Sequence, residues 1–180
     1  KEAKGPIVIN MSSSRVTEDL AQQFGVACKR AAVGEANVVG LMRETDALLG
    51  GEGNGGVIDP RVGWVRDPFI GMALVLQLLA DSDEKLSALV DALPKYTIVK
   101  DKYTVSRELL PKLNAMLEAR WPEATPNRVD GLRLDWPDHW MHVRPSNTEP
   151  IVRVIAEAPR PADAQRLCQE VGAILNGMSR

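Results

Sequence analysis

The sequence predicts an α/β protein built in two parts. The first is a three-layer α/β domain with a mainly parallel sheet, and the second is an α+β domain with an antiparallel sheet and helices on one face. The first is predicted because short apolar runs alternate with helical patterns up to about residue 94. The second is predicted because the later apolar runs follow one another through turns, as the strands of hairpins do. We place residues 1–96 in the first domain and residues 97–180 in the second.

The composition is that of a globular protein with a packed core. Of the 180 residues, 44% are hydrophobic and 26% are charged, and the formal net charge is −2. Proteins that bind nucleic acids or anionic membranes need a basic face, so this slightly acidic chain argues against both partners. No apolar run is long enough to span a bilayer, and the N-terminus does not resemble a signal peptide.

The first domain is expected to alternate strands and helices. A helix that begins near Thr17 should end at Gly25, because glycine adopts the left-handed conformation that closes helices. A second helix should begin at Gly34 and Glu35. The strands around them are short and comprise residues 6–10, 26–30 and 47–49.

Two further helices are expected before the domain boundary. Asp67 is a good N-cap and Pro68 suits the first helical position, so a strong helix should begin there, with Arg66 assigned to the same capping region. Ser82 is expected to open another helix that ends near Leu93. The first of these helices has apolar side chains at helical spacing, namely Phe69, Met72, Ala73, Leu76, Leu79 and Ala80.

The second domain is expected to have the order β-α-β-β-β-α. Its helices are predicted over residues 106–120 and from Arg160, where the last helix should stop at Gly177. In the strands, alternation places Met141 and Val143 on one sheet face, against the last helix. The predicted strands comprise residues 96–99, 132–136, 140–144 and 151–155.

The loop from Arg144 to Pro150, between the last two predicted strands, contains most of the functional information. Its guanidinium, hydroxyls and amide offer many hydrogen-bond donors, which suits a phosphate dianion. Alternation places Arg144 and Arg153 on one sheet face, where they would flank one pocket. The alternative is an ordinary polar hairpin loop with an ion pair between Arg144 and Glu149. The candidate phosphate-binding residues are Arg144, Ser146, Asn147, Thr148 and Arg153.

The glycine-rich segment from Gly50 to Gly56 is the second candidate site. Five of its seven residues are glycine, which lets a ligand approach the backbone closely. The carboxylate of Glu52 and the amide of Asn54, on either side of Gly53, form a good pair for binding vicinal sugar hydroxyls. The glycine spacing matches neither a dinucleotide fingerprint nor a P-loop. The alternative is a flexible turn.

Three other positions are weaker candidates for ligand contacts. Ser12 and Arg15 offer a hydroxyl and a cation, but a serine run before a helix more often provides a cap. Glu35 either faces a ligand or favours the helix N-terminus. Cys28 and Cys168 are expected to be buried reduced thiols, as in a cytoplasmic protein, and no pair of Cys or His residues has metal-ligand spacing.

Three segments together resemble the α-D-phosphohexomutase family, which includes phosphoglucomutase, phosphomannomutase and phosphoglucosamine mutase. They are the run from Val33 to Val38, the glycine-rich segment and the run from Arg144 to Val154. The resemblance covers essentially the whole chain and corresponds to the third and fourth domains of the family. It implies an isomerase that interconverts hexose 1-phosphate and hexose 6-phosphate through a bisphosphorylated sugar.

The resemblance also implies roles for individual residues. Glu52 would bind sugar hydroxyls, and Arg144, Ser146, Asn147 and Thr148 would hold the phosphate that is not reacting. Many relatives have Gly-Glu-x-Ser-Gly-His at the sugar loop, whereas this chain has Asn54 at the serine position and Gly56 at the histidine position. Similarly, Glu35 stands where some relatives have a histidine, and Ser12 where some have a lysine.

The motifs of the family's first two domains do not occur in this sequence. The resemblance implies a phosphoserine loop and a magnesium-binding loop, so we expect partner domains that supply the phosphoserine and the Mg²⁺, and we expect this chain alone to be inactive. The alternative is a non-catalytic module that binds sugar phosphates. The second domain is also similar in architecture to the TATA-binding protein, but fold analogy does not establish a nucleic-acid function.

Overall fold

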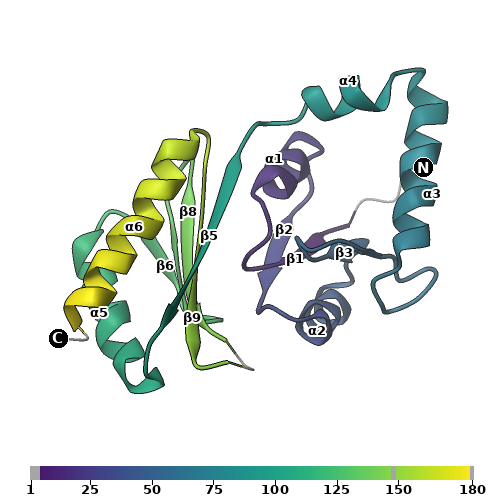
Figure 1. Cartoon of the computed structure of the whole chain (residues 1–180). Helices are drawn as coiled ribbons and strands as arrows, with labels where there is room; N and C mark the ends of the chain where they lie inside the picture. The colour runs from purple at the N-terminus through teal and green to yellow at the C-terminus, as the bar shows by residue number, and fades with distance from the viewer. Residues whose placement is uncertain (1–4, 147–148, 179–180) are drawn as a thin grey trace. The chain divides into compact units, whose positions relative to one another are not determined.

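A computed structural model describes residues 5–146 and 149–178 of the chain. The chain divides into two compact units, Lys1–Lys95 and Tyr96–Arg180. Each unit contains one sheet and its own helices (Figure 1). The predicted fold class is confirmed, because the first sheet is mostly parallel and the second is entirely antiparallel.

The sheet of the first unit has the strand order β2-β1-β3-β4. The central strand β1 (Ile7–Asn10) is parallel to both β2 (Cys28–Ala31) and β3 (Leu49–Gly51). The short strand β4 (Val57–Ile58) returns antiparallel to β3 and was not predicted. The ends of β1 and β3 therefore lie side by side at one edge of the sheet.

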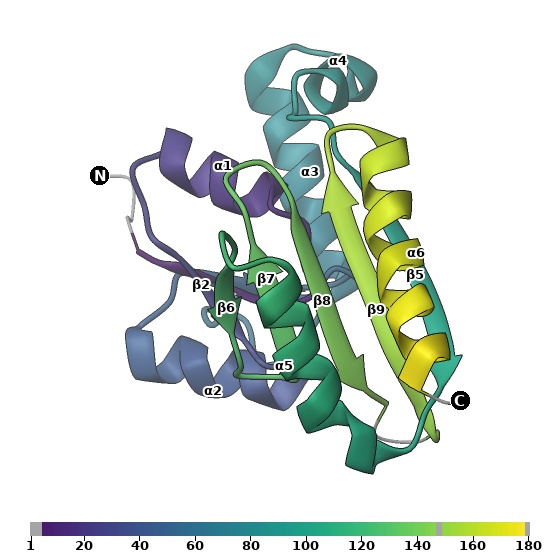
Figure 2. The same cartoon turned by 90° about the vertical axis from the view of Figure 1, so that its left-hand side faces the viewer.

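Two helices cover opposite faces of this sheet and make the three layers (Figures 1 and 2). They are α1 (Val16–Gln23) and α2 (Glu35–Thr45). Val38 and Met42 of α2 pack against strand residues such as Val8 and Ile58, and all four are fully buried. The helix periodicity of the sequence predicted both elements, and Gly25 follows α1 with φ of 67° as expected.

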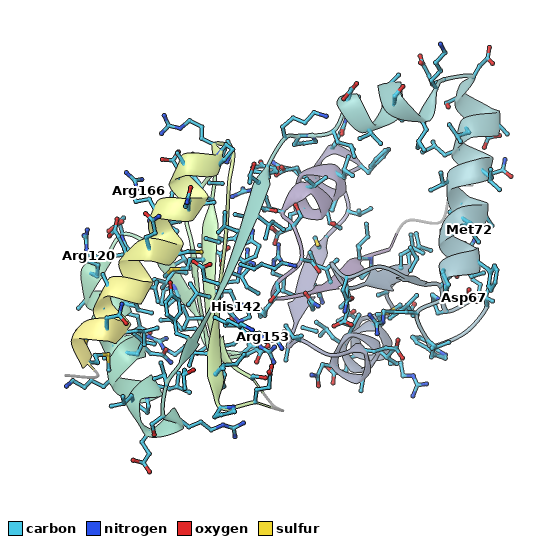
Figure 3. All side chains as sticks on the ribbon, in the orientation of Figure 1. Asp67, Met72, Arg120, His142, Arg153 and Arg166 are labelled. Atoms are coloured by element: carbon cyan, nitrogen blue, oxygen red, sulfur yellow. The ribbon has the colours of Figure 1, made fainter. Side chains whose placement is uncertain are left out.

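Helix α3 (Pro68–Ser82) begins where the sequence predicted, but its apolar side chains are not buried. Asp67 caps it, accepting hydrogen bonds from the backbone N–H groups of Phe69 at 2.8 Å and Ile70 at 3.4 Å. Figure 3 labels Asp67 at the start of the helix and Met72 along it. Phe69 is 73% exposed and Leu76 is 66% exposed.

The boundary between α3 and the next helix differs from the prediction. Ser82 is the last residue of α3 and does not open a new helix, because Asp83 follows in the left-handed conformation with φ of 54°. The next helix, α4 (Leu86–Asp91), begins later. None of the helices in the described part of the chain combines the length and hydropathy needed to cross a membrane.

The sheet of the second unit has the strand order β5-β9-β8-β7-β6. Strand β5 is longer than predicted, because its polar residues pair along the full length of β9, and β6 was not predicted at all. The predicted long helix begins as a short 3₁₀ turn, η1 (Arg107–Leu109). The strands are β5 (Thr97–Thr104), β6 (Thr125–Asn127), β7 (Leu132–Asp135), β8 (Trp140–Pro145) and β9 (Ile151–Ala158).

Helices α5 (Leu110–Arg120) and α6 (Pro161–Met178) lie across the same face of this sheet (Figure 2). Met141 and Val143 belong to the core beneath them, as the alternation predicted. Gly177 does not end the last helix, which runs through it to Met178. From α6 the core receives Ala164, Leu167, Cys168, Val171 and Leu175.

Candidate functional site

The carboxylate of Glu52 lies at the centre of a hydrogen-bonded cluster in the first unit. Its Oε1 accepts hydrogen bonds from Asn10 Nδ2 at 2.8 Å and from the backbone N–H of Gly34 at 2.9 Å. Its Oε2 is 3.1 Å from Arg66 Nη1, and the side chain is only 4% exposed. Asn10 ends β1 and Glu52 follows β3, so the cluster lies at the carboxyl edge of the parallel strands. This edge is where open α/β sheets bind ligands.

Arg66 connects Glu52 to two other predicted site residues. Its Nε donates to Glu35 Oε2 at 2.9 Å, and its Nη1 donates to Asn54 Oδ1 at 2.7 Å. The hydrogen bond from Arg66 to the Glu35 side chain is the main reason that the pKa of Glu35 is lowered. Arg66 was assigned to helix capping, which is wrong, because Asp67 alone provides the cap.

Gly56 lies directly against Arg66. Its φ is +80°, and a Cβ atom added there would lie 2.7 Å from the Cβ of Arg66. Real Cβ atoms essentially never approach another heavy atom so closely, and the Cβ of Arg66 is fixed to the backbone and cannot swing away. The stem of Arg66 therefore occupies the space that any side chain at position 56 would need.

Replacing Gly56 with alanine should destabilise the first unit more than replacing Gly55. Both glycines have positive φ, +80° and +101°, so both replacements strain the backbone by about 1–2 kcal/mol. Only the replacement at 56 also forces Arg66 to move, since nothing lies within 4 Å of the Cβ position at Gly55. Urea unfolding of both variants measures the difference, and equal losses of unfolding free energy would contradict the packing of Arg66 on Gly56.

Ser12 lies close to the same cluster through Asn10. Asn10 Oδ1 accepts hydrogen bonds from the backbone N–H of Ser12 at 3.0 Å and from the hydroxyl of Ser13 at 2.9 Å. A Cβ on Gly53 would lie 3.3 Å from Ser13 Cα, so the serine turn packs against the glycine loop. Arg15 is the N-cap residue of α1 and is 3.9 Å from Asp19. The prediction that a serine is the N-cap of α1 is wrong, because Arg15 is the N-cap residue and makes no side-chain cap hydrogen bond. The serine turn instead supports Asn10, the partner of Glu52.

In the second unit, Arg144 and Arg153 are direct partners across β8 and β9. They therefore share one sheet face, as the alternation predicted, and Figure 3 labels Arg153 there. Arg144 Nε lies 3.0 Å from Asp130 Oδ2, and the Arg144 side chain is 10% exposed. This contact is an ion pair without good hydrogen-bond geometry, because the Nε–H of Arg144 has no acceptor in the described residues.

The ion pair that the sequence suggested between Arg144 and Glu149 is wrong. Glu149 Oε2 is 3.6 Å from Arg153 Nη2, and Arg144 faces Asp130 instead. Asp130 lies on the turn before β7, fourteen residues upstream, so nothing local to the loop indicated it. Two guanidinium groups lie opposite each other, each with one carboxylate neighbour, and guanidinium N–H groups are donors that can bind an anion.

The backbone of Ser146 makes two hydrogen bonds at the start of the loop, one to the backbone of Ile151 and one to the side chain of Arg107. The N–H of Ser146 donates to the carbonyl of Ile151 at 2.8 Å, and its carbonyl accepts from Arg107 Nη2 at 2.8 Å. Ser146 is 2% exposed. Arg107, in η1, has no sequence signal and was not predicted as part of this loop. The two other predicted phosphate-binding residues, Asn147 and Thr148, lie outside the described residues.

His142 and Gly131 fix the position of Asp130 beside Arg144. His142 Nε2 contacts the backbone carbonyl of Asp130, and burial is the main reason that its pKa is lowered to about 4. The imidazole is therefore neutral at neutral pH. Gly131 has φ of +73°, and a Cβ there would lie 2.9 Å from Arg144 Cα and would overlap the carbonyl oxygen of Val143. The absence of a side chain at 131 lets this turn pack directly against β8.

Comparison with known proteins identifies both units. The domain described as "Phosphoglucomutase/phosphomannomutase, alpha/beta/alpha domain III" matches residues 1–96. The domain described as "Phosphoglucomutase/phosphomannomutase, C-terminal domain" matches residues 124–174.

Among curated relatives, a probable phosphoglucosamine mutase of Methanopyrus kandleri is 34% identical over 94% of this chain and 38% of its own length. A phosphoglucomutase/phosphomannomutase of Thermococcus kodakarensis is 33% identical over 86% of this chain and 34% of its own length. The chain thus spans less than two fifths of these relatives.

Solved structures agree with the fold. A phosphoglucomutase/phosphomannomutase family protein of Burkholderia thailandensis is 26% identical over 97% of this chain and 38% of its own, with a TM-score of 0.80. An N-acetylphosphoglucosamine mutase of Aspergillus fumigatus, solved with glucose 1,6-bisphosphate, is 16% identical over 96% of this chain and 38% of its own, with a TM-score of 0.71. At this identity the second likeness concerns the fold alone.

Proposed function

Since the chain belongs to the phosphoglucomutase/phosphomannomutase family, we propose that it forms the substrate-binding part of a phosphosugar mutase. The whole enzyme would interconvert hexose 1-phosphate and hexose 6-phosphate through a bisphosphorylated sugar. The observation that carries the proposal is the presence of two candidate binding sites in one chain. They are the Glu52 cluster in the first unit and the two facing arginines, Arg144 and Arg153, in the second.

The proposed reaction transfers a phosphoryl group twice. A phosphoserine outside this chain gives its phosphoryl group to the free hydroxyl of a hexose phosphate, so that a serine P–O bond breaks and a sugar P–O bond forms. A base accepts the hydroxyl proton. The sugar bisphosphate then reorients, so that its two phosphates exchange places. The original phosphate next passes to the serine, which restores the phosphoserine and releases the isomer. The residues of this chain bind and orient the sugar and take no part in the bond changes.

Each unit has one task in this proposal. The Glu52 carboxylate accepts hydrogen bonds from sugar hydroxyls, and the Arg144 loop holds the phosphate that is not reacting. Holding a remote phosphate supplies binding energy and orientation for the end of the sugar that reacts. Because either phosphate must fit, the loop has to recognise a dianion without contacting a particular sugar carbon, and the paired arginines suit that task.

Mg²⁺ is expected to support the phosphoryl transfer, as the family resemblance implies. Among the described residues, no three His, Cys, Asp or Glu side chains are grouped as metal ligands would be. We therefore propose that the ion is held by residues outside this chain. The chain's own side chains neither coordinate the metal nor donate the phosphoryl group in this scheme.

The full-length protein that contains this chain tests the proposal. We expect it to convert at least one of the 1-phosphates of glucose, mannose and glucosamine to the corresponding 6-phosphate, consistent with the names of its relatives. A coupled assay on each sugar measures kcat/KM. If none of the three is converted while hexose phosphates still bind, the non-catalytic sugar-phosphate binding module would be the better description.

A further inference from the structure

The proposed function leaves Arg66 without a task, although Arg66 joins Glu35, Asn54 and Glu52. Its Nε and Nη1 atoms are used by Glu35, Asn54 and Glu52. Its Nη2 atom donates to no acceptor within residues 5–146 and 149–178. The side chain is 31% exposed, so this unused end of the guanidinium can be reached from outside. An arginine that served only to link the loop would not need to present two free donors beside it.

The side chain of Arg66 occupies the space that a side chain at position 56 would otherwise fill. Gly56 has none, and the Cβ, Cγ and Cδ atoms of Arg66 lie 2.7, 3.4 and 3.5 Å from where a Cβ at 56 would stand. The glycine-rich segment from Gly50 to Gly56 therefore has one neighbouring polar group, the guanidinium of Arg66, that comes from a different segment, the loop before α3. The guanidinium lies beside Asn54 and Glu52, the two side chains that the sequence assigned to sugar binding.

We infer that Arg66 contacts the sugar ring of the phosphosugar substrate, in place of a side chain at position 56, and that it selects ligands with vicinal hydroxyl groups. This inference rests on the proposed function of the Glu52 cluster. A hydroxyl group both donates and accepts hydrogen bonds. One sugar hydroxyl can therefore donate to Glu52 Oε2 while it accepts from Arg66 Nη2, because the same guanidinium is already 3.1 Å from that oxygen at Nη1.

The charges around Arg66 fit a contact with hydroxyls better than a contact with a phosphate. Two carboxylates, those of Glu35 and Glu52, lie within 2.9 and 3.1 Å of the guanidinium. Their combined negative charge exceeds the charge of the arginine and would repel a phosphate dianion. A neutral hydroxyl meets no such repulsion and satisfies the free donors of Arg66. Phosphate recognition is accordingly left to Arg144 and Arg153 in the other unit.

The test uses the full-length protein in calorimetric titrations with glucose 6-phosphate and, separately, with inorganic phosphate. Arg66→Ala is expected to raise the Kd for glucose 6-phosphate by about 10- to 100-fold, as for the loss of a charge-assisted hydrogen bond. The Kd for inorganic phosphate should stay within about twofold of wild type. Arg66→Lys, which keeps the charge but not the planar fork, should recover only part of the loss.

Arg61→Ala is the matched control. Arg61 lies between β4 and α3, as Arg66 does, and forms an ion pair with Asp59 at 2.6 Å, but it has no contact with Glu52 in the described structure. This variant should leave both Kd values within about twofold of wild type. Thermal unfolding of each variant, followed by circular dichroism, shows whether it is folded.

The outcomes separate the inference from its premise. If the 6-phosphates of glucose, mannose and glucosamine all bind wild-type protein no more tightly than inorganic phosphate, the proposed function fails and the inference with it. If only one of the other two binds more tightly, it replaces glucose 6-phosphate in the titrations. If wild type prefers the sugar phosphate and Arg66→Ala retains that preference, the inference alone is overturned. Arg66→Ala losing affinity for both ligands, together with a lower Tm, would also overturn it, because Arg66 would then serve only the fold.

Discussion

Replacing Arg144 with alanine should lower kcat/KM of the full-length protein for its best hexose phosphate by about 10- to 100-fold. This range corresponds to about 1.5–3 kcal/mol for a hydrogen bond to a charged group. The guanidinium is 10% exposed, so it meets an anion in a setting that water screens poorly. Its loss also removes the cation that faces Asp130 at 3.0 Å and so leaves more negative charge beside the phosphate.

Two further variants make the Arg144 prediction specific. Arg144→Lys keeps the charge but cannot offer paired donors to two phosphate oxygens, so its kcat/KM should fall between wild type and Arg144→Ala. Arg160→Ala removes an arginine whose side chain is 81% exposed and which pairs only with Asp163 among the described residues. It should leave kcat/KM unchanged. Steady-state kinetics measures all three, and an unaltered kcat/KM in Arg144→Ala would rule out the proposed phosphate contact.

Replacing Gly131 with alanine should destabilise the second unit by about 3 kcal/mol or more, through both backbone strain and overlap. The new Cβ would overlap the carbonyl oxygen of Val143 and lie 2.9 Å from Arg144 Cα. Both are main-chain atoms of β8, the central strand that pairs with β7 and β9. No side-chain rotation relieves the contact, so the backbone of β8 must shift and its pairing with β7 must weaken.

Gly25→Ala is the matched control for this effect. Gly25 has φ of +67°, close to the +73° of Gly131, but nothing lies within 4 Å of its Cβ position. Its replacement should cost only the strain of the left-handed backbone, about 1–2 kcal/mol. Urea unfolding followed by tryptophan fluorescence measures both variants, because Trp64 reports on the first unit, which contains Gly25, and Trp121, Trp136 and Trp140 report on the second. If Gly131→Ala is no more destabilising than Gly25→Ala, the close packing of the turn on β8 is wrong.

Much of the fold could be predicted from the sequence, because most helices and strands have their signals within their own residues. Asp67 and Pro68 begin α3 by cap and proline chemistry that needs no distant partner. The elements that were missed have weak local patterns. Strand β4 has only two residues, and β6 contains Pro126 at a sheet edge, where proline is tolerated. The polar centre of β5, from Lys100 to Lys102, hides a strand that becomes evident only from its pairing with β9.

The candidate site was predicted only where its chemistry lies in a short segment. Glu52 and Asn54 stood out because glycines surround them, and Arg144 and Arg153 because strand alternation places them on one face. Arg66 did not stand out, since its partner Glu35 is 31 residues away and no motif connects them. Asp130 and Arg107 were missed for the same reason. Contacts of this kind depend on how loops from separate elements meet, which the sequence pattern does not encode.

The close contact between Gly56 and Arg66 also constrains how this loop can change during evolution. A histidine at position 56, which the family resemblance suggests for other sugar-binding loops, cannot be accommodated while the Cβ of Arg66 lies 2.7 Å from where its Cβ would stand. A lineage that moves between the two loop types must therefore remove the Cβ at position 66 or shift its backbone before, or together with, the change at position 56. The same order applies in the laboratory, where a chimera that receives the relatives' sugar loop without the segment around residue 66 would inherit a steric conflict instead of a new sugar preference.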